Sequence, residues 1–263
     1  MVLLVHDKSD GVRVLTLNRP EKKNALSPEL VDALAQALVA ADQDKSVRVV
    51  VLTGAEEPAS TRAAFCAGGD LGGGLPGDGF FEQHKQRGGF AELLLTFRRM
   101  GKPTIAMVNG MALGGGFGLV LACDLALACD DAELGTPEVK RGLFPMMIAA
   151  LIYEQLPRKA ANDLVLTGGK VSGARAVELG VVNRVVNKAE LLAATMSYAQ
   201  QIASLSTSVL QLGKRAIQQQ HDMPFEQKLA FLRDQLTLNL HLEDAAEGIA
   251  AFLQKREPHW KGR

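Results

Sequence analysis

Two short apolar runs constrain the fold of this chain more than any other feature. Val47–Leu52 and Pro103–Val108 consist mainly of apolar residues, and they end at Thr53-Gly54 and Asn109-Gly110. Strands without a polar face are typical of parallel sheets that are buried on both sides. Parallel strands need long crossover connections, which are usually helices. The sequence therefore predicts an α/β fold in which helices cover a parallel sheet.

Helix and strand signals alternate through the first two thirds of the chain. Val12–Leu17 alternates apolar and polar residues, which indicates a strand. Ser27-Pro28-Glu29 predicts a helix start, because serine caps the first turn, proline fits it, and glutamate is favoured by the helix dipole. The other predicted elements are helices over Phe90–Met100 and Phe117–Cys123 and strands over Asp124–Cys129 and Val181–Val186.

The pattern changes after about Leu143, where almost all signals become helical. Residues 188–255 are rich in leucine and alanine and contain no strand pattern. We therefore divide the chain into a core with the active site, residues 1–187, and a helical region, residues 188–263. The helical region is expected to pack on the core or on a neighbouring subunit.

Composition and charge exclude several classes of protein. Of 263 residues, 47% are hydrophobic and 22% are charged, as in ordinary globular proteins. The 29 basic and 29 acidic side chains cancel, so no overall field favours nucleic acid or an anionic membrane. No apolar run is long enough to span a bilayer. We expect neither a membrane nor a nucleic-acid partner.

Three cysteines, Cys66, Cys123 and Cys129, are widely spaced and form no C-x-x-C pair. An odd, scattered set argues against a disulfide framework or a zinc site and fits a reducing compartment. We expect these cysteines to be small buried hydrophobic residues. A cytoplasmic location is the expectation that follows.

Two glycine-rich segments are candidates for binding an anion through the main chain. Ala64–Leu71 follows the first buried strand, and Asn109–Gly116 links the second to a helix. Small residues let a ligand approach the backbone, and helix N-termini expose unpaired N–H groups with partial positive charge. Two such segments from neighbouring strands could direct one amide each at one oxygen, as in an oxyanion hole.

Other common sites are not indicated. Gly114–Gly118 does not match the dinucleotide-binding pattern G-x-G-x-x-G, because Leu119 stands where the third glycine belongs. There is no phosphate-binding loop of the G-x-x-x-x-G-K-[ST] type and no G-x-S-x-G nucleophile elbow. The five histidines are scattered without ligand spacing, so no metal is expected.

Thr136-Pro137-Glu138 has two interpretations. The first is structural: threonine caps a helix, proline fits its first turn, and the dipole favours glutamate. In the second, the Glu138 carboxylate faces a substrate and moves protons on its carbon chain. The local pattern alone does not choose between them.

Taken together, these segments resemble the crotonase family, also called the enoyl-CoA hydratase/isomerase family. The resemblance covers essentially the whole chain, in order and at family spacing. It rests on residues 12–20, Asn24-Ala25-Leu26, Ala64–Leu71, Asn109–Gly116, Cys123-Asp124, Thr136-Pro137-Glu138, Leu166-Thr167-Gly168, Ala176–Asn183 and Phe252–Arg263.

The resemblance implies a core of ββα turns arranged in a spiral and a C-terminal helical region that builds trimers, often paired into hexamers. Gly69 and Gly115 match the two oxyanion-hole amides, which stabilise the enolate of an acyl-CoA thioester. Coenzyme A is then part of the substrate, and no separate cofactor is expected. Residues implied to bind the coenzyme A moiety are Lys22, Lys23, Ala25, Ala67, Asp70 and Leu71, with Phe252 and Lys255 reaching it from a neighbouring subunit.

The chain departs from the family pattern in two places. Typical hydratases hold a water between two glutamates, but here only Glu138 is present and Gly118 occupies the other position. A glycine-rich turn that usually follows is replaced by the bulkier Arg141–Met147. Leu143, Phe144, Met146 and Met147 could form an apolar wall that raises the basicity of the glutamate. A lone carboxylate favours Δ3-to-Δ2 enoyl-CoA isomerisation, in which one group removes the α-proton and returns it at the γ-carbon.

Other functions stay open at this point. The first alternative is an enoyl-CoA hydratase that uses one glutamate or a second acid from elsewhere in the chain. Other enolate chemistry, such as decarboxylation or thioester hydrolysis, is a further alternative. The most distant one is a non-catalytic scaffold that binds coenzyme A esters or RNA.

Overall fold

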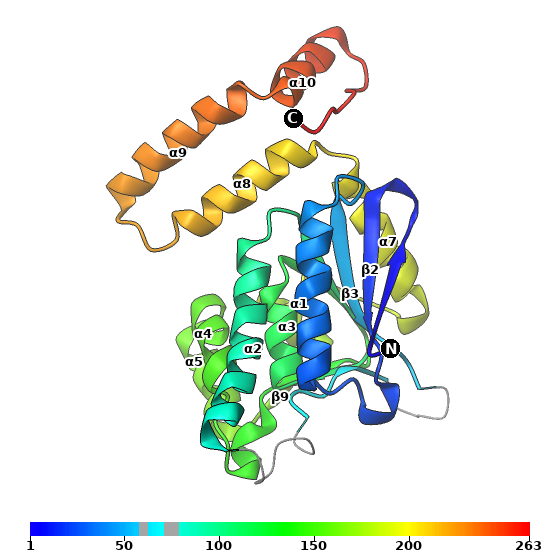
Figure 1. Ribbon diagram of the computed structural model, residues 1–263, viewed down its shortest axis with the longest axis vertical. Helices are drawn as coiled ribbons and strands as arrows, with labels where there is room; N and C mark the ends of the chain where they lie inside the picture. The colour runs from blue at the N-terminus through cyan, green and yellow to red at the C-terminus, as the bar shows by residue number, and fades with distance from the viewer. Residues whose placement is uncertain (58–62, 71–78) are drawn as a thin grey trace.

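The computed structural model describes residues 1–57, 63–70 and 79–263 (Figure 1). The elements up to the middle of the chain are β1 (Leu3–Asp7), η1 (Ser9–Gly11), β2 (Val12–Leu17), η2 (Pro20–Lys22), α1 (Pro28–Gln43), β3 (Val49–Gly54), β4 (Ala64–Cys66), α2 (Phe80–Arg99), β5 (Thr104–Val108), β6 (Met111–Leu113) and α3 (Gly115–Ala122). They are followed by β7 (Leu125–Cys129), β8 (Glu133–Gly135), η3 (Pro137–Arg141), α4 (Met146–Gln155), α5 (Arg158–Thr167), β9 (Lys170–Ser172), α6 (Gly173–Glu178), β10 (Arg184–Val186), η4 (Lys188–Glu190), α7 (Leu191–Ala203), α8 (Thr207–Gln219), α9 (Phe225–Leu240) and α10 (Glu243–Gln254).

A six-stranded sheet forms the centre of the body, in the order β1-β2-β3-β5-β7-β10. Its pairs are parallel except for β1 with β2. Helix α1 packs against β1 and β2, and α7 packs against β2, β3, β5 and β7; the two helices lie in front of and behind the sheet in Figure 1. All six residues of β3 are buried, as the apolar run predicts for a doubly covered strand.

A second sheet has four strands in the order β4-β6-β8-β9, and its first three strands are parallel. Each of β4, β6, β8 and β9 has only three residues. Such strands are too short for a periodic signal, so the sequence pattern does not reveal this sheet. It matters for function, because the three candidate segments follow β4, β6 and β8.

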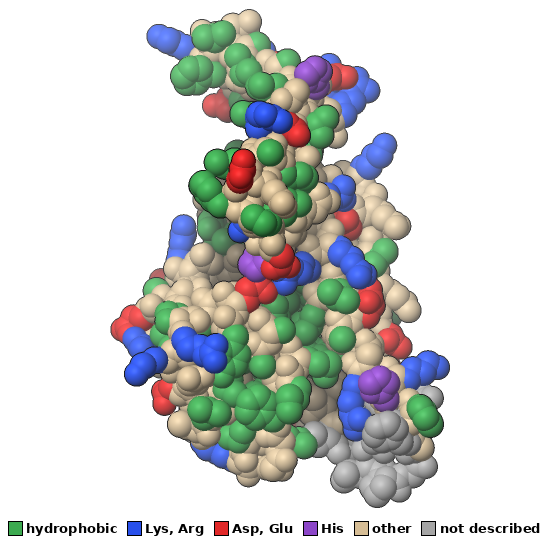
Figure 2. Space-filling view, turned by 90° about the vertical axis from the view of Figure 1, so that its left-hand side faces the viewer, with side chains coloured by type: hydrophobic (Ala, Val, Ile, Leu, Met, Phe, Trp, Pro, Cys, Tyr) green, Lys and Arg blue, Asp and Glu red, His purple; other side chains and the backbone are tan. Residues whose placement is uncertain are grey.

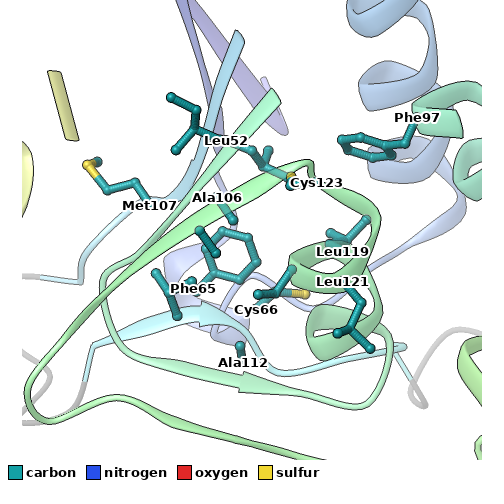
Figure 3. Packing of buried hydrophobic residues seen from close by; sticks show 14 of the residues in the cluster. Leu52, Phe65, Cys66, Phe97, Ala106, Met107, Ala112, Leu119, Leu121 and Cys123 are labelled. Carbon is teal, nitrogen blue, oxygen red and sulfur yellow. The ribbon is translucent and has the colours of Figure 1, made fainter. Parts of the chain in front are cut away.

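The hydrophobic core lies between the two sheets and the helices. Figure 3 shows Phe65 and Cys66 of β4 among Ala106 of β5, Ala112 of β6 and Leu119 of α3. All of these residues are buried. Cys66, Cys123 and Cys129 are free and buried, as predicted. The core therefore holds the short strand before Gly69 firmly in place.

Several predicted boundaries differ from those of the structure. Helix α2 begins at Phe80, ten residues before the predicted start, because its first half is polar and carries no apolar period. The prediction that Thr136 caps a helix is wrong. The Thr136 hydroxyl donates to the Leu164 carbonyl instead (2.8 Å), and the element that follows is a short 3₁₀ helix. The Ser27 cap is confirmed, since its side chain accepts a hydrogen bond from the Leu30 amide.

Helices α8, α9 and α10 project from the body at the C-terminal end (Figure 1). Helix α10 packs against α8 and α9, and α9 has no buried residue. Hydrophobic side chains lie exposed on this projection as well as on the lower body (Figure 2). The fold thus has a helical extension, although α7 of the predicted helical region packs against the sheet. The division at residue 187 stays a prediction.

Candidate active site

Three loops meet where three strands of the small sheet end. Cys66 pairs with Ala112, and Leu113 pairs with Gly135, so β4, β6 and β8 run side by side in the same direction. Parallel strands bring the loops at their carboxyl ends to one edge of a sheet. The segments around Gly69, Gly115 and Glu138 are therefore neighbours, as the functional interpretation requires.

The Gly115 amide lies at the start of helix α3. Gly114 precedes it with φ +53°, a conformation that glycine adopts without strain. The first N–H groups of a helix have no carbonyl partner within the helix. Among the described residues, the Gly115 amide donates to no other backbone carbonyl. It is free to bind an anion.

The Gly69 amide lies beside it. Leu26 forms an isolated parallel bridge with Gly69: the Leu26 amide donates to the Gly68 carbonyl, and the Asp70 amide donates to the Leu26 carbonyl. This pattern leaves the amide of Gly69 unused in the part of the chain that the structure describes. A Cβ atom built on Gly115 would lie 3.7 Å from the Gly69 nitrogen. The arrangement fits two amides that share one acceptor oxygen.

Glu138 approaches these amides from the third loop. A Cβ atom built on Gly114 would lie 2.8 Å from Oε1 of Glu138, so the carboxylate packs against the backbone at the start of α3. Its Oε2 is buried and has no hydrogen-bond partner among the described residues. Burial raises the pKa of Glu138, while its own backbone amide and the charge of Arg141 act in the opposite direction. A carboxylate that lacks a partner and has a raised pKa is suited to accept a proton.

A cavity of about 280 Å³ connects the three loops. Its described lining residues are Lys22, Ala25, Ala67, Gly68, Gly69, Asp70, Gly114, Pro137, Glu138, Arg141 and Leu143. The structure thus brings together Glu138, Gly69, Lys22, Ala25, Ala67 and Asp70 of the predicted residues, with Gly115 next to them.

The remaining predicted residues lie elsewhere. Lys23 is exposed, and its carbonyl accepts a hydrogen bond from the Ala67 amide (3.0 Å). Phe144 and Met146 are exposed at the start of α4 and do not line the described cavity. Leu71 lies outside the described residues.

Phe252 lies in the last turn of α10 and Lys255 caps it, at the opposite end of the molecule from β9 of the small sheet (Figure 1). Phe252 is 82% exposed. Within one chain these two residues do not reach the cavity, so their predicted contact with coenzyme A would need a second copy.

Two residues that hold the site were not singled out from the sequence. Asn24 is fully buried: its Nδ2 donates to the carbonyls of Ala55 (2.9 Å) and Ala64 (2.7 Å), and its Oδ1 accepts from the Arg19 amide (3.0 Å). Its φ of +55° is tolerated by asparagine better than by most residues. That preference, just after a proline turn, is the signal that could have identified it.

Arg19 fixes the loop that carries Asp70. The Arg19 guanidinium donates to the Ala25 carbonyl (2.6 Å) and to Oδ2 of Asp70 (2.8 Å). The Asp70 carboxylate is therefore part of an ion pair that joins two walls of the cavity. This contact gives Asp70 a positioning role in the protein, in addition to the predicted contact with coenzyme A.

The space at Gly118 is filled. A Cβ atom built on Gly118 would overlap the Cγ2 methyl of Ile148, and it would lie 3.7 Å from the ring of Phe90. Ile148 is 3% exposed and belongs to α4, which packs against α3. A larger side chain at position 118 therefore requires Ile148 to move. The site has an apolar contact where a second acid would need room.

A second, larger hollow of about 620 Å³ lies away from these loops, between the start of the chain and α7. Its Arg48 side chain donates to the Ala203 carbonyl (2.9 Å). The carboxylate among its described lining residues, Asp10, is exposed to solvent and therefore does not resemble the half-buried Glu138. We therefore place the candidate active site at the smaller cavity.

Neither a metal site nor a membrane span is indicated in the part of the chain that the structure describes. No three histidine, cysteine, aspartate or glutamate side chains cluster there in a way that could hold a metal ion. No helix within residues 1–57, 63–70 and 79–263 is long and apolar enough to cross a membrane.

Comparisons with known proteins identify the family and the fold of the chain. A family profile described as enoyl-CoA hydratase/isomerase matches residues 7–263. A carnitinyl-CoA dehydratase of Escherichia coli is 35% identical over 261 residues, 97% of each chain. A mitochondrial protein of Mus musculus, enoyl-CoA hydratase domain-containing protein 3, is 34% identical over 96% of this chain and 82% of its own length. The crystal structure of an enoyl-CoA hydratase from Mycobacterium smegmatis superposes with a TM-score of 0.93 at 33% identity, covering 99% of each chain. The chain therefore belongs to the enoyl-CoA hydratase/isomerase, or crotonase, family and has its fold.

Proposed function

We propose that this protein is an enoyl-CoA isomerase that converts Δ3- into Δ2-enoyl-CoA thioesters. Members of its family act on acyl-CoA thioesters. One observation carries the choice of reaction: Glu138 is the only carboxylate without an ion pair among the described residues that line the cavity. Ile148 fills the space at Gly118. A reaction that needs one acid and no added water suits this site best.

In the proposed mechanism the thioester oxygen accepts hydrogen bonds from the Gly69 and Gly115 amides. Glu138 removes a proton from the α-carbon, and the electron pair spreads over the dienolate to the γ-carbon. The same carboxyl group then returns the proton to the γ-carbon, which leaves the double bond between the α- and β-carbons. Glu138 ends ionised as it began, and no water is consumed or released.

The two amides are essential to this step. An α-proton beside a thioester is too weakly acidic for a carboxylate unless the developing oxyanion is stabilised, and losing one such donor costs about 3–4 kcal/mol of barrier. The raised pKa of Glu138 acts in the same direction, since it makes the carboxylate a stronger base.

The main alternative is hydration or dehydration. Relatives with these activities in their names support this alternative; they include a carnitinyl-CoA dehydratase and an enoyl-CoA hydratase. Glu138 would then have to activate water alone or with a second acid from outside the described lining. A scaffold that binds coenzyme A esters or RNA without turnover is the least favoured alternative, because scaffolding does not require a carboxylate with a buried oxygen that lacks a hydrogen-bond partner.

The experiment is a product analysis with 3-hexenoyl-CoA and 2-hexenoyl-CoA, carried out in deuterated water. We expect interconversion of the two enoyl esters, with 3-hydroxyhexanoyl-CoA forming at least about a hundredfold more slowly. Faster formation of the hydroxy ester would assign a hydratase. If both esters bind and neither reacts, the protein is a scaffold.

We further propose a homotrimer, or a hexamer made of two trimers, as the functional assembly. The exposed apolar side chains of α9 and α10 support this, because such surfaces in water usually mark an interface. A cytoplasmic location stays a prediction, supported by three free, buried cysteines. Sedimentation of the purified protein at micromolar concentration tests the assembly.

A further inference from the structure

Arg141 differs from the other arginines of the described segments. Each of the others has a partner in the chain, such as a carboxylate, a carbonyl oxygen or an aromatic ring. Within the described residues, the only attraction of Arg141 is the one between its charge and the Glu138 carboxylate. No carboxylate of these segments lies within ion-pair distance of its guanidinium. Arg141 therefore presents an uncommitted positive charge to the cavity that it lines.

The position of Arg141 follows from the helix that carries it. Pro137–Arg141 forms the 3₁₀ helix η3, in which side chains three residues apart lie on the same face. Glu138 and Arg141 are three residues apart and both line the cavity. Three residues of such a helix rise about 6 Å. Arg141 thus lies one turn beyond the proposed base along η3.

The other cation among the described lining residues of the cavity is Lys22. Lys22 ends the 3₁₀ helix η2, beside Ala25 and Ala67, on the wall that the family resemblance assigns to coenzyme A. Asp70 adds no free negative charge between them, because Arg19 binds its carboxylate. The described lining therefore carries two cations, Lys22 and Arg141, although a simple thioester has anionic groups only in its coenzyme A part.

We propose that Arg141 selects acyl-CoA substrates whose acyl chain carries a carboxylate. The inference deepens the proposed function and rests on it, because Glu138 marks where the reacting carbons lie. A guanidinium binds a carboxylate through two parallel hydrogen bonds, a geometry that a neutral chain end cannot use. From the γ-carbon next to Glu138, a chain of roughly six to eight carbons brings its terminal carboxylate to Arg141.

The first test measures binding without turnover. Titration calorimetry compares hexanoyl-CoA with the coenzyme A monothioester of hexanedioic acid and with 6-aminohexanoyl-CoA, and the eight-carbon series is measured in the same way. We expect the carboxylate ligand to bind wild-type protein about tenfold more tightly than the neutral one, and the amino ligand to bind more weakly. In Arg141→Ala the ratio of carboxylate to neutral affinity should fall to near one, and in Arg141→Glu the order should reverse.

Lys140→Ala is the matched control. Lys140 is the exposed neighbour of Arg141 on the same helix, it does not line the cavity, and its loss changes the net charge equally. The affinity ratio should be unchanged in this variant. A tenfold ratio that survives in Arg141→Ala would overturn the proposal. Equal weakening of all ligands and of free coenzyme A would overturn it too, since Arg141 would then bind the coenzyme A phosphates.

The second test separates this inference from the proposed function. The isomerisation of 3-hexenoyl-CoA and of the monothioester of 3-hexenedioic acid is measured with wild type and Arg141→Ala. A preference for the acidic substrate, lost in the variant, supports both proposals. Selective binding of the carboxylate ligands without isomerisation contradicts the reaction and leaves the selectivity intact. Isomerisation with no preference in kcat/KM contradicts the role of Arg141 alone.

Discussion

Strand β3 buries all six of its residues within the chain, whereas helix α9 buries none of its sixteen. The body of the molecule covers its sheet with its own helices and keeps the candidate site between three of its own loops. The extension of α8, α9 and α10 leaves apolar side chains in contact with solvent. The difference indicates that the body forms the candidate site by itself, while the extension presents an apolar surface that the proposed assembly would cover.

We expect the largest effect from a substitution in the body of the molecule. Glu138→Gln removes the proposed base and keeps the size of the side chain, so kcat for 3-hexenoyl-CoA should fall by about a thousandfold. Affinity for hexanoyl-CoA and the mass of the assembly should stay the same. The matched control is Glu133→Gln in β8, which loses only an exposed pair with Lys170 and should remain active. An active Glu138→Gln enzyme would remove this residue from the mechanism.

The next effect concerns the filled space at Gly118. Gly118→Glu should lower the free energy of unfolding by about 3 kcal/mol, because its Cβ overlaps the Ile148 side chain. Combining it with Ile148→Ala should recover part of the loss relative to the single variant and place a second acid near the cavity. Denaturant unfolding measures the stability of each variant. The rate at which the double variant hydrates 2-hexenoyl-CoA should exceed the rate of wild type. If Gly118→Glu is as stable as wild type, the packing interpretation is wrong.

A third change tests the extension alone. Phe225, Leu229, Leu236 and Leu240 are exposed and lie on one face of α9. Leu236→Lys should reduce the mass in sedimentation from that of the assembly towards one chain, while the circular dichroism of the body is retained. Gln227→Lys adds the same charge on the other side of this helix and should leave the mass unchanged. Unchanged mass in both variants would show that α9 is not the interface.

The smallest effect is the pH dependence of the reaction. Because burial raises the pKa of Glu138, kcat/KM should increase with pH, and the midpoint of this increase should lie above the ordinary pKa of a glutamate. Arg141→Ala should move this limb to higher pH, since the nearby positive charge favours ionisation, whereas Lys140→Ala should not move it. A limb at the ordinary pKa of glutamate would contradict the burial of the group.

The same pKa shift links Glu138 to stability. The folded protein holds this proton more tightly than the unfolded chain does, so stability should decrease as pH rises through the raised pKa. Above that pH the ionised, half-buried carboxylate destabilises the body fully, and the cost disappears only below the pKa of a glutamate in the unfolded chain. The gain in Tm from Glu138→Gln should therefore be larger at pH 8 than at pH 5.

Much of the body could be predicted from the sequence, because long elements have periodic patterns. The apolar runs led to β3 and β5, and Ser27 marked the start of α1. The small sheet could not be predicted from three-residue strands. The candidate amides and Glu138 could be predicted from the glycine-rich segments, the Pro-Glu pair and the family resemblance.

The rest of the site depends on contacts between distant residues. Ile148 fills the space at Gly118 from a helix thirty positions later, and no local pattern records that contact. The same is true of Asn24, which joins Ala55, just after β3, to Ala64, the first residue of β4. The uncommitted charge of Arg141 is visible only when the partners of the other arginines are known.

The single bridge between Leu26 and Gly69 has a consequence for catalysis. Leu26 follows Lys22 and Ala25 in the same segment. Its main-chain hydrogen bonds with Gly68 and Asp70 fix the position of the Gly69 nitrogen between them. In the proposed function, binding of the coenzyme A part of the substrate by this segment would therefore be coupled to the position of the Gly69 amide. A thioester shortened to N-acetylcysteamine should accordingly turn over more slowly even at saturation, because interactions far from the reacting carbons help to align the donor.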